Sequence, residues 1–285
     1  MEFQNINKLK KVINDCQAVF VIAGAGMSVD SGIFTYRGKE GLWEKSIQVG
    51  NEMYRYSDIS SLEMWKKNPE VAWGFKANFY KMINENEPHE GYQILLNYVK
   101  NKMNENYFIC TSNVDNYFEK AGFDKNKIYE AHGSMKLYQC MDKKCSMLHG
   151  PVEHKDIKIP DFNPENFVAT NMPKCLYCGK IMRPNVSMFG DYDFYEKPYE
   201  FIKKKMLSWL NDIKEKNKKL LVLEIGCGIN PHSMRIVDNK PMSKEFKLPE
   251  IENKIFIRLN PENEENKDVI HLNCGALKGL KSLLC

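Results

Sequence analysis

The chain has 285 residues and a mass of 33.2 kDa, more than the ~100–200 residues of a typical domain, so we expect one large domain with an insertion, or two domains. Apolar residues make up 43% and aromatic residues 12% of the sequence, which excludes wholesale disorder and fibrous low-complexity sequence. The net charge is only +4, without a long basic block, so the charge pattern gives no reason to expect direct nucleic-acid binding.

The N-terminal residues, the apolar stretches and the cysteine content indicate in which cellular compartment the protein is expected. Residues 1–16 are too charged for a signal peptide, and the longest apolar stretch, residues 18–27, is far shorter than the ~20 residues of a membrane span. We expect a soluble intracellular protein without a membrane partner, in the cytoplasm rather than the nucleus. Nine cysteines in a reducing compartment favour metal ligands or free thiols over disulfides.

The predicted elements alternate between helices and buried strands. Apolar spacing predicts a helix over residues 5–17, and another helical pattern runs from Tyr92 to Val99. Short, continuous apolar runs predict strands at residues 18–23, 107–111, 219–225 and 254–259. Apolar strands separated by helices indicate a parallel sheet covered on both faces, so the fold class is α/β.

Two stretches depart from this alternation. Residues 40–83 carry Trp, Tyr and Met at helical spacing, which predicts a small helical insertion whose aromatic side chains form a core. Residues 136–183 form a polar, proline-containing stretch with four cysteines. We expect this second insertion to be organised by something other than apolar burial.

The four cysteines form two pairs, Cys140 with Cys145 and Cys175 with Cys178. Four thiolates suit tetrahedral Zn²⁺, and a site with no open position is structural. A loop this polar has little apolar surface with which to bury four unrelated cysteines. The pattern therefore predicts a structural zinc site, whose metal affinity contributes folding free energy.

A glycine-rich turn follows the first predicted strand. Gly24, Gly26 and Ser28 offer close backbone approach to a phosphate, although one such turn is equally compatible with a plain tight turn. A second turn, Gly226-Cys-Gly228, follows another strand and favours the phosphate interpretation. The third glycine of the dehydrogenase fingerprint is replaced by Val29, which disfavours ordinary hydride transfer.

Polar residues follow two further apolar segments. Asn113 and Asp115 come after the strand at 107–111, where parallel sheets place ligand contacts, although such a pair also caps helices. His132 follows the apolar segment 127–131, and a lone histidine is more often structural than catalytic. Only the combination of these residues points to a site.

Taken in order, the motifs resemble those of a known family. They are GAGMSVDSGI at residues 24–33, YRG at 36–38, TSNVD at 111–115, HG at 132–133, the paired cysteines, and RPNVSMFGD at 183–191. This order resembles the sirtuin family over most of the chain. The resemblance implies a Rossmann-like NAD-binding domain and a smaller domain made of a helical module and a zinc-ribbon module.

On this resemblance the chain divides into three parts. Residues 1–39, 84–135 and 184–285 are expected to form the Rossmann-like domain. Residues 40–83 would form the helical module, and residues 136–183 the zinc-binding module.

The resemblance implies an NAD-dependent protein-lysine deacylase. NAD is the co-substrate, and an acyl-lysine protein or peptide yields free lysine, nicotinamide and O-acyl-ADP-ribose. His132 matches the base that acts on a ribose hydroxyl once nicotinamide has left, and an imidazole accepts a proton near neutral pH. Asn113, the second catalytic residue, and Asp115 match residues that position the nicotinamide end and a water.

The remaining site residues are also assigned by resemblance. The phosphate and ribose loop corresponds to Gly24, Ala25, Gly26, Ser28 and Arg37, and the second phosphate turn to Gly226 and Gly228. Asn260 and Cys274 correspond to the adenosine end. The strand that walls the acyl-lysine channel and pairs with substrate backbone corresponds to Val186, Phe189 and Gly190.

Two features keep other functions open. Thr35 and Cys227-Gly228 resemble a branch associated with protein ADP-ribosylation, although that branch commonly lacks the histidine retained here as His132. A non-catalytic NAD or ADP-ribose binding module is a further alternative. A zinc-ribbon nucleic-acid adaptor is disfavoured because the loop between the cysteine pairs mixes basic and acidic residues.

The acyl group is not indicated by the sequence. A Tyr and an Arg three residues apart, the pair associated with acidic-acyl selectivity in one sirtuin branch, are absent from residues 50–60.

Overall fold

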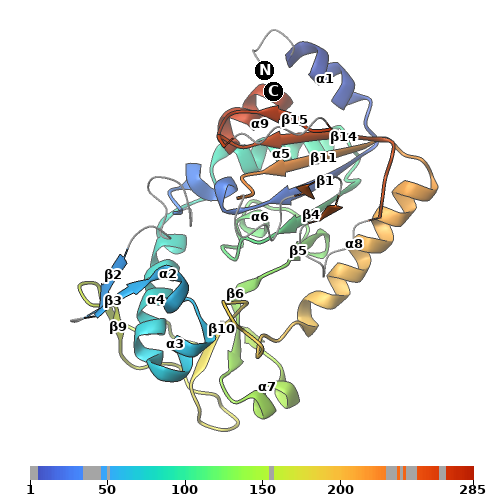
Figure 1. Cartoon of the computed structure of the whole chain (residues 1–285). Helices are drawn as coiled ribbons and strands as arrows, with labels where there is room; N and C mark the ends of the chain where they lie inside the picture. The colour runs from blue at the N-terminus through green and yellow to red at the C-terminus, as the bar shows by residue number, and fades with distance from the viewer. Residues whose placement is uncertain are drawn as a thin grey trace.

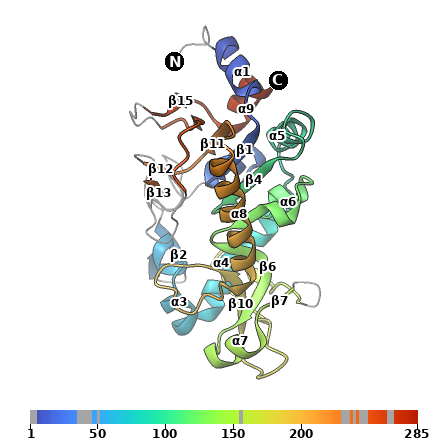
Figure 2. The ribbon, with the colours of Figure 1, turned by 90° about the vertical axis from the view of Figure 1, so that its right-hand side faces the viewer.

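The structure is a computed structural model of the whole chain (Figure 1). It describes residues 6–34, 46–49, 52–153, 157–228, 236–237, 240–241, 249–262 and 268–285. A central sheet with flanking helices occupies one end of the elongated molecule, and further helices with short strands occupy the other (Figures 1 and 2).

The central sheet has six strands, all parallel, in the order β15-β14-β11-β1-β4-β5. Their bounds are β1 Ala18–Ala23, β4 Tyr107–Thr111, β5 Ile128–Glu130, β11 Leu220–Ile225, β14 Lys254–Leu259 and β15 Ile270–Leu272. The four predicted strands are present, and the α/β fold class is confirmed. Sequence reasoning did not assign β15 as a strand.

Alternate residues of the central strand β1 belong to two separate cores. Val19, Val21 and Ala23 pack in the core that includes α1 (Ile6–Asn14), α5 (Glu90–Asn101) and α9 (Ala276–Leu284). Ala18, Phe20 and Ile22 pack on the opposite face against the long helix α8 (Lys197–Glu215). Both faces of β1 are therefore buried, which explains its uninterrupted apolar sequence.

The first insertion is helical only in part. Its helices are α2 (Tyr56–Ile59), α3 (Leu62–Lys67) and α4 (Pro69–Glu85), but an antiparallel pair, β2 (Ser46–Val49) and β3 (Glu52–Arg55), precedes them. The purely helical interpretation of residues 40–83 is thus wrong at its start. The two strands are short and exposed along most of their length, so their sequence lacks the apolar runs that revealed the central strands.

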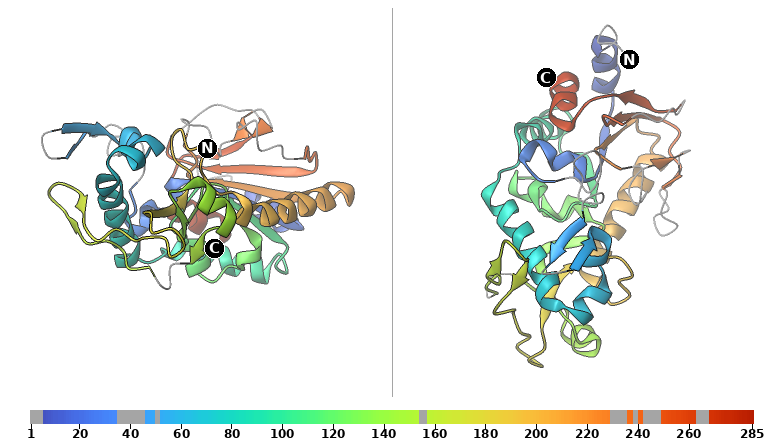
Figure 3. Two further views of the ribbon diagram at one scale, coloured as in Figure 1. Left: turned by 90° about the horizontal axis from the view of Figure 1, so that it is seen from below. Right: turned by 60° about the vertical axis from the view of Figure 1, so that its left-hand side comes forward.

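The second insertion is built on a ribbon that leaves the central sheet. Strand β6 (Gly133–Cys140) pairs antiparallel with β10 (Met182–Val186) and with β7 (Val152–Glu153), and α7 (Lys143–His149) follows β6 (Figure 3). The predicted boundaries at residues 135/136 and 183/184 fall inside β6 and β10. The division into domains remains a prediction.

The other elements are short. They are the 3-10 helices η2 (Ala25–Ser31) and η3 (Lys125–Lys127), helix α6 (Tyr117–Lys120), and the strand pairs β8 (Phe162–Asn163) with β9 (Val168–Ala169) and β12 (Ile236–Val237) with β13 (Lys240–Pro241). Among the described residues, none forms a helix with the length and apolar character that a bilayer crossing requires.

Candidate active site

The two glycine turns lie against each other at the carboxyl edge of the sheet. Gly26 N donates a hydrogen bond to the Gly226 carbonyl at 3.0 Å, and Gly24 N donates to Ile225 O at 2.9 Å. A Cβ at Gly24 would lie 2.6 Å from Gly226 O, and one at Gly26 would lie 2.6 Å from Gly226 Cα. Gly226 itself has a φ of 61°, in the left-handed region. These glycines are therefore required by backbone packing within the protein.

A buried polar cluster lies beside these turns, made of Ser28, Tyr92, Asn113 and Asp115. The Ser28 hydroxyl donates to Asp115 Oδ2 at 2.6 Å. Since its single proton is used there, Ser28 Oγ accepts from Asn113 Nδ2 at 3.1 Å and from the Tyr92 hydroxyl at 2.8 Å. The cluster brings together residues that the sequence analysis assigned to one site from two distant segments.

Asp115 is the acidic member of this cluster. Its second carboxylate oxygen accepts from Tyr117 N at 3.0 Å at the start of α6. Burial raises the pKa of Asp115 above its ordinary value, and the hydrogen bonds from Ser28 and the backbone act in the opposite direction. The adjoining Asn113 is held through its backbone N, which donates to Thr111 Oγ1 at 3.0 Å. Both side chains are thus fixed at the end of β4.

His132 lies between the central sheet and the small modules, on the turn from β5 to β6. Its carbonyl accepts from Ser187 N at 2.9 Å, which ties the turn to the end of β10. Among the described residues, no group forms a hydrogen bond with the half-buried His132 ring. Burial lowers the pKa of the imidazole, so the ring is neutral near pH 7. It is therefore able to accept a proton.

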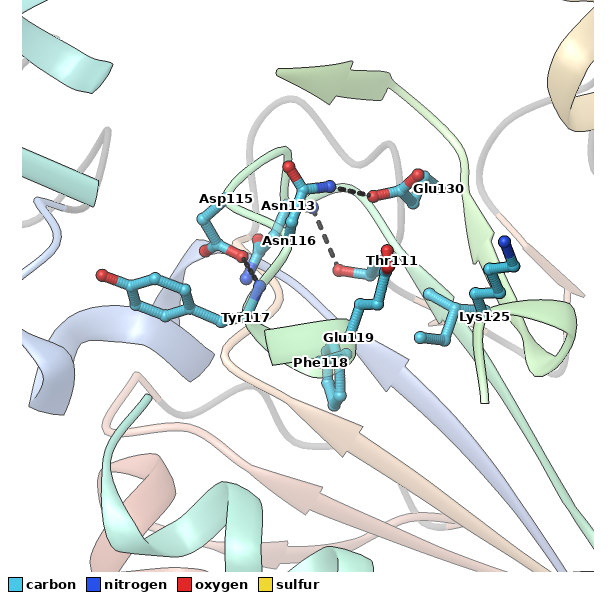
Figure 4. A pocket seen from close by; sticks show the side chains of 10 residues that line it. Thr111, Asn113, Asp115, Asn116, Tyr117, Phe118, Glu119, Lys125 and Glu130 are labelled. Atoms are coloured by element: carbon cyan, nitrogen blue, oxygen red, sulfur yellow. Dashed lines mark hydrogen bonds between the residues drawn. The ribbon is translucent and has the colours of Figure 1, made fainter. Parts of the chain in front are cut away.

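A small pocket, which the sequence analysis missed, lies beside the loop that carries Asn113 and Asp115 (Figure 4). Within it Asn116 Nδ2 donates to Glu130 Oε1 and to Ser134 Oγ, both at 2.6 Å. Asn116 has a φ of 61°, which asparagine tolerates better than most residues. Burial raises the pKa of Glu130 to about 8. The sequence feature that could have indicated this pocket is Glu130, an acidic residue at the end of an apolar segment, directly before Ala131 and His132.

The residues assigned to the adenosine end have distinct places. Asn260 Nδ2 donates to Cys227 O at 2.8 Å, so this buried amide supports the Gly226–Gly228 turn. Cys274, the other residue assigned to the adenosine end, is half-buried before α9.

The remaining residues were assigned to the phosphate and ribose positions. Gly228 is exposed. Ala25 lies in η2 beside Gly26. Arg37 and Thr35 fall outside the described residues.

The segment assigned to substrate binding continues from β10. Val186 is buried and pairs with Gly133. Phe189 N donates to Ser60 O at 3.0 Å and Phe189 O accepts from Leu62 N at 3.2 Å, so the Phe189 backbone is already paired with the helical insertion. The Phe189 side chain is partly exposed, and Gly190 follows with a φ of 62°. Any backbone pairing with a peptide must therefore use neighbours of Phe189.

The four cysteines converge at the far end of the molecule from the sheet. Their Sγ atoms all lie within 4.8 Å of one another, with 3.4 Å between Cys140 and Cys178 and 3.6 Å between Cys145 and Cys175. None of the four is in a disulfide. Sulfur atoms around tetrahedral zinc, with Zn–S of about 2.3 Å, lie ~3.8 Å apart. The donor set and spacing fit a structural zinc site.

Asp142 organises the backbone around this cluster. Its amide donates to Cys140 Sγ at 3.3 Å, and its Oδ1 caps α7 by accepting from Cys145 N at 2.9 Å. Lys180 approaches its other oxygen at 2.7 Å. These contacts join the two cysteine pairs and orient the thiols.

Comparisons with known proteins identify a family and relatives that resemble this chain. The Sir2 family profile matches residues 24–209. A protein named NAD-dependent protein deacylase from Thermococcus sibiricus is 29% identical over 186 residues, which cover 65% of each chain. One of the same name from Aquifex aeolicus is 30% identical over 188 residues, covering 64% of this chain and 66% of the relative. The chain thus aligns with just under two thirds of the length of these relatives.

Two solved structures have the same fold. A complex of a Sir2 homologue variant with ADP ribose superimposes with a TM-score of 0.69 at 22% identity, covering 97% of this chain and 94% of that one. A Sir2 homologue in complex with NAD gives a TM-score of 0.66 at 22% identity, covering 98% and 92%. Because the profile match extends over well more than half of the sequence, the chain belongs to the Sir2 family.

Proposed function

We propose that the chain is an NAD-dependent protein-lysine deacylase. The observation that carries the proposal is that the Ser28, Asn113 and Asp115 cluster and His132 all follow the carboxyl ends of strands of one parallel sheet, where α/β folds bind ligands. The names of the Thermococcus and Aquifex relatives point in the same direction.

The polar cluster suits the nicotinamide end of NAD. Asn113 and Asp115 are buried, and their hydrogen bonds to Ser28 fix the direction in which their remaining donor and acceptor sites point. A fixed set of dipoles stabilises developing charge without reorganising during the reaction. The exposed Gly228, which follows the Cys227 carbonyl held by Asn260, permits close approach of a phosphate.

His132 suits the role of general base. Its pKa lies below the ordinary value, so the imidazole is neutral at physiological pH, and the described part of the chain leaves its nitrogens without a competing partner. In this role the ring takes the proton from a ribose hydroxyl of the NAD-derived intermediate as the hydroxyl oxygen attacks the acyl carbon. The substrate lysine then leaves as the free amine.

The acyl-lysine would enter past the end of β10, beside the Phe189 backbone that is paired with the helical insertion. Val186 closes one side, and its neighbour Ser187 is bonded to the His132 carbonyl, so this strand end and the proposed base are held together. A lysine side chain passing Val186 would present its acyl group near the imidazole.

The experiment is a mass balance. The protein is incubated with NAD and an acetyl-lysine peptide while nicotinamide, peptide mass and protein mass are followed together. The proposal expects one nicotinamide for each peptide that loses its acyl group, with an unchanged protein mass. A protein that gains the mass of ADP-ribose while the peptide keeps its acyl group would contradict deacylation and favour ADP-ribosyl transfer.

A further inference from the structure

Asn116, the residue directly before α6, does not do what an asparagine at the start of a helix usually does. Such a residue is ordinarily extended, and its side chain caps the helix. Asn116 has a φ of 61° and a ψ of 18°, in the left-handed region, and its side chain makes no capping bond. Asp115 supplies the cap, since its Oδ1 accepts from Tyr117 N. The Asn116 amide is therefore available for contacts outside the helix.

The Asn116 amide is bonded on both sides of His132. Its Nδ2 donates to Glu130 Oε1 and to Ser134 Oγ, both at 2.6 Å, and Figure 4 shows the first of these bonds. Both amide protons are thus used. Glu130 lies two residues before His132, and Ser134 lies two residues after it. One side chain therefore holds both ends of the segment 130–134, which has the proposed base at its centre.

Backbone bonds join the same segment to the loop that carries the polar cluster. Ala131 N donates to Thr111 O at 2.8 Å, and Met135 N donates to Val114 O at 3.3 Å. Within the described part of the chain, the backbone between Ala131 and Met135 makes no further bond to this loop. The Asn116 side chain spans that interval. It is the side-chain link between the proposed base and the polar cluster.

The other side of the base is held by strand β10. Ser187 N donates to the His132 carbonyl at 2.9 Å, and Val186 pairs with Gly133. These contacts are made by backbone atoms and persist when the Asn116 side chain is removed. Loss of the amide should therefore leave the fold in place and loosen His132 relative to the polar cluster. A general base must lie within hydrogen-bond reach of its proton, and a misplacement of about 1 Å can cost about 10²-fold in rate.

We propose that Asn116 is a positioning residue for deacylation, which acts by holding His132 in a fixed place relative to the polar cluster. This inference rests on the proposed deacylase function. The proposed reaction uses the polar cluster when nicotinamide leaves and the base only afterwards, so the two parts must both address one NAD-derived intermediate.

Asn116→Gly is the variant of choice, because glycine adopts a φ of 61° without strain and removes only the side chain. Deacylation of an acetyl-lysine peptide and exchange of labelled nicotinamide into NAD are measured with the parent and the variant. Deacylation should fall about 10–100-fold, because the base is misplaced. Exchange and the KM for NAD should change by less than about threefold, because the bonds of Ser28 to Asn113 and Asp115 remain.

A double variant tests whether Asn116 acts through His132. Deacylation by His132→Ala, with and without Asn116→Gly, is followed over a single turnover with enzyme in excess. Removal of the amide should lower the rate by less than about twofold in this background, since no base is left to position. A role in general stability predicts the same fold loss as in the parent.

Two matched variants separate positioning from folding. Asn217 is an exposed asparagine with a φ of 48° in the turn before β11, at the opposite edge of the sheet, so Asn217→Gly should leave both rates unchanged. Glu130→Gln keeps an acceptor for the Asn116 amide, whereas Glu130→Ala removes it. Glu130→Gln should therefore retain more of the deacylation rate than Glu130→Ala.

Four outcomes would overturn the proposal in distinguishable ways. Deacylation by Asn116→Gly at the parental rate would refute the positioning role and leave the deacylase function standing. Equal losses of exchange and deacylation, with a lower melting temperature, would assign Asn116 a structural role. An undiminished effect of Asn116→Gly in the His132→Ala background would show that it does not act through the base. A parent protein that releases no nicotinamide with an acetyl-lysine peptide would reject the proposed function, and the positioning role with it.

Discussion

The polar cluster at the sheet edge and the cysteine cluster at the far end are both assembled from distant segments, but by different forces. The sheet edge is held by apolar strands buried on both faces, whose register brings Asn113 and Ser28 together. In the cysteine module apolar side chains such as Tyr138, Ala169 and Met182 join the main core, and the four thiols meet at the spacing of a metal site. The sheet-edge cluster is positioned by the core, whereas the cysteine cluster depends on what its thiols bind.

This difference predicts how each cluster fails. A substitution in the sheet-edge cluster removes hydrogen bonds from a frame that remains folded, so its cost is limited. Loss of one thiol removes the metal, and with it the free energy that orders the module.

The largest effect is expected from the cysteine cluster. Cys175→Ser should reduce bound zinc from about one per chain to a small fraction and disorder the segment between β6 and β10. Metal analysis and limited proteolysis measure both changes. Cys285→Ser, which alters an exposed thiol, is the matched control. A folded Cys175→Ser protein with full zinc content would mean that the four thiols are not the metal ligands.

A smaller effect is expected at the sheet edge. Ser28→Ala removes the acceptor of Asn113 and Tyr92 and the donor to Asp115, which should cost about 1–3 kcal/mol of unfolding free energy. Denaturant titration measures the change, and Ser208→Ala on the exposed side of α8 is the control. If Ser28→Ala were as stable as the parent, the cluster would not be the rigid frame described above.

The smallest effect is a pH dependence at Glu130. Burial raises the folded-state pKa of this acid to about 8, above its unfolded value, so the folded protein holds the proton more tightly. Its contribution to stability is complete below the unfolded pKa and is lost as pH rises through about 8. Glu130→Gln, which keeps an acceptor for Asn116, should gain about 1–2 kcal/mol at pH 9 and little at pH 5.

Melting curves of the parent and Glu130→Gln from pH 5 to pH 9 measure this difference. Burial also raises the pKa of Asp115, so part of the dependence of the melting temperature on pH should persist in Glu130→Gln. If the melting temperatures of the two proteins changed with pH in parallel, Glu130 would be ionised across the whole range from pH 5 to pH 9.

The central sheet was predictable because its strands are continuous apolar runs that alternate with helices. The β2–β3 pair was not, because its residues are mostly exposed and leave no apolar run. The cysteine site was predictable from spacing alone, since all its ligands are of one rare residue type.

The sheet-edge site was predictable only in part. Resemblance identified Ser28, Asn113 and Asp115, and the structure brings these three together. Tyr92 was missed because its spacing marks it as an ordinary core residue of α5. The direct packing of Gly26 on Gly226 was also hidden, and because of it a side chain at position 26 would disturb the backbone packing itself.

The most direct test of the account is the separation of two partial reactions in His132→Ala. Exchange of labelled nicotinamide into NAD needs only the first step, whereas deacylation also needs the base. The account predicts a fall in deacylation of roughly 10²–10⁴-fold with far better retention of exchange, and no change in either rate for His149→Ala, an exposed histidine. Deacylation by His132→Ala at the parental rate would contradict the assignment of His132 as the base.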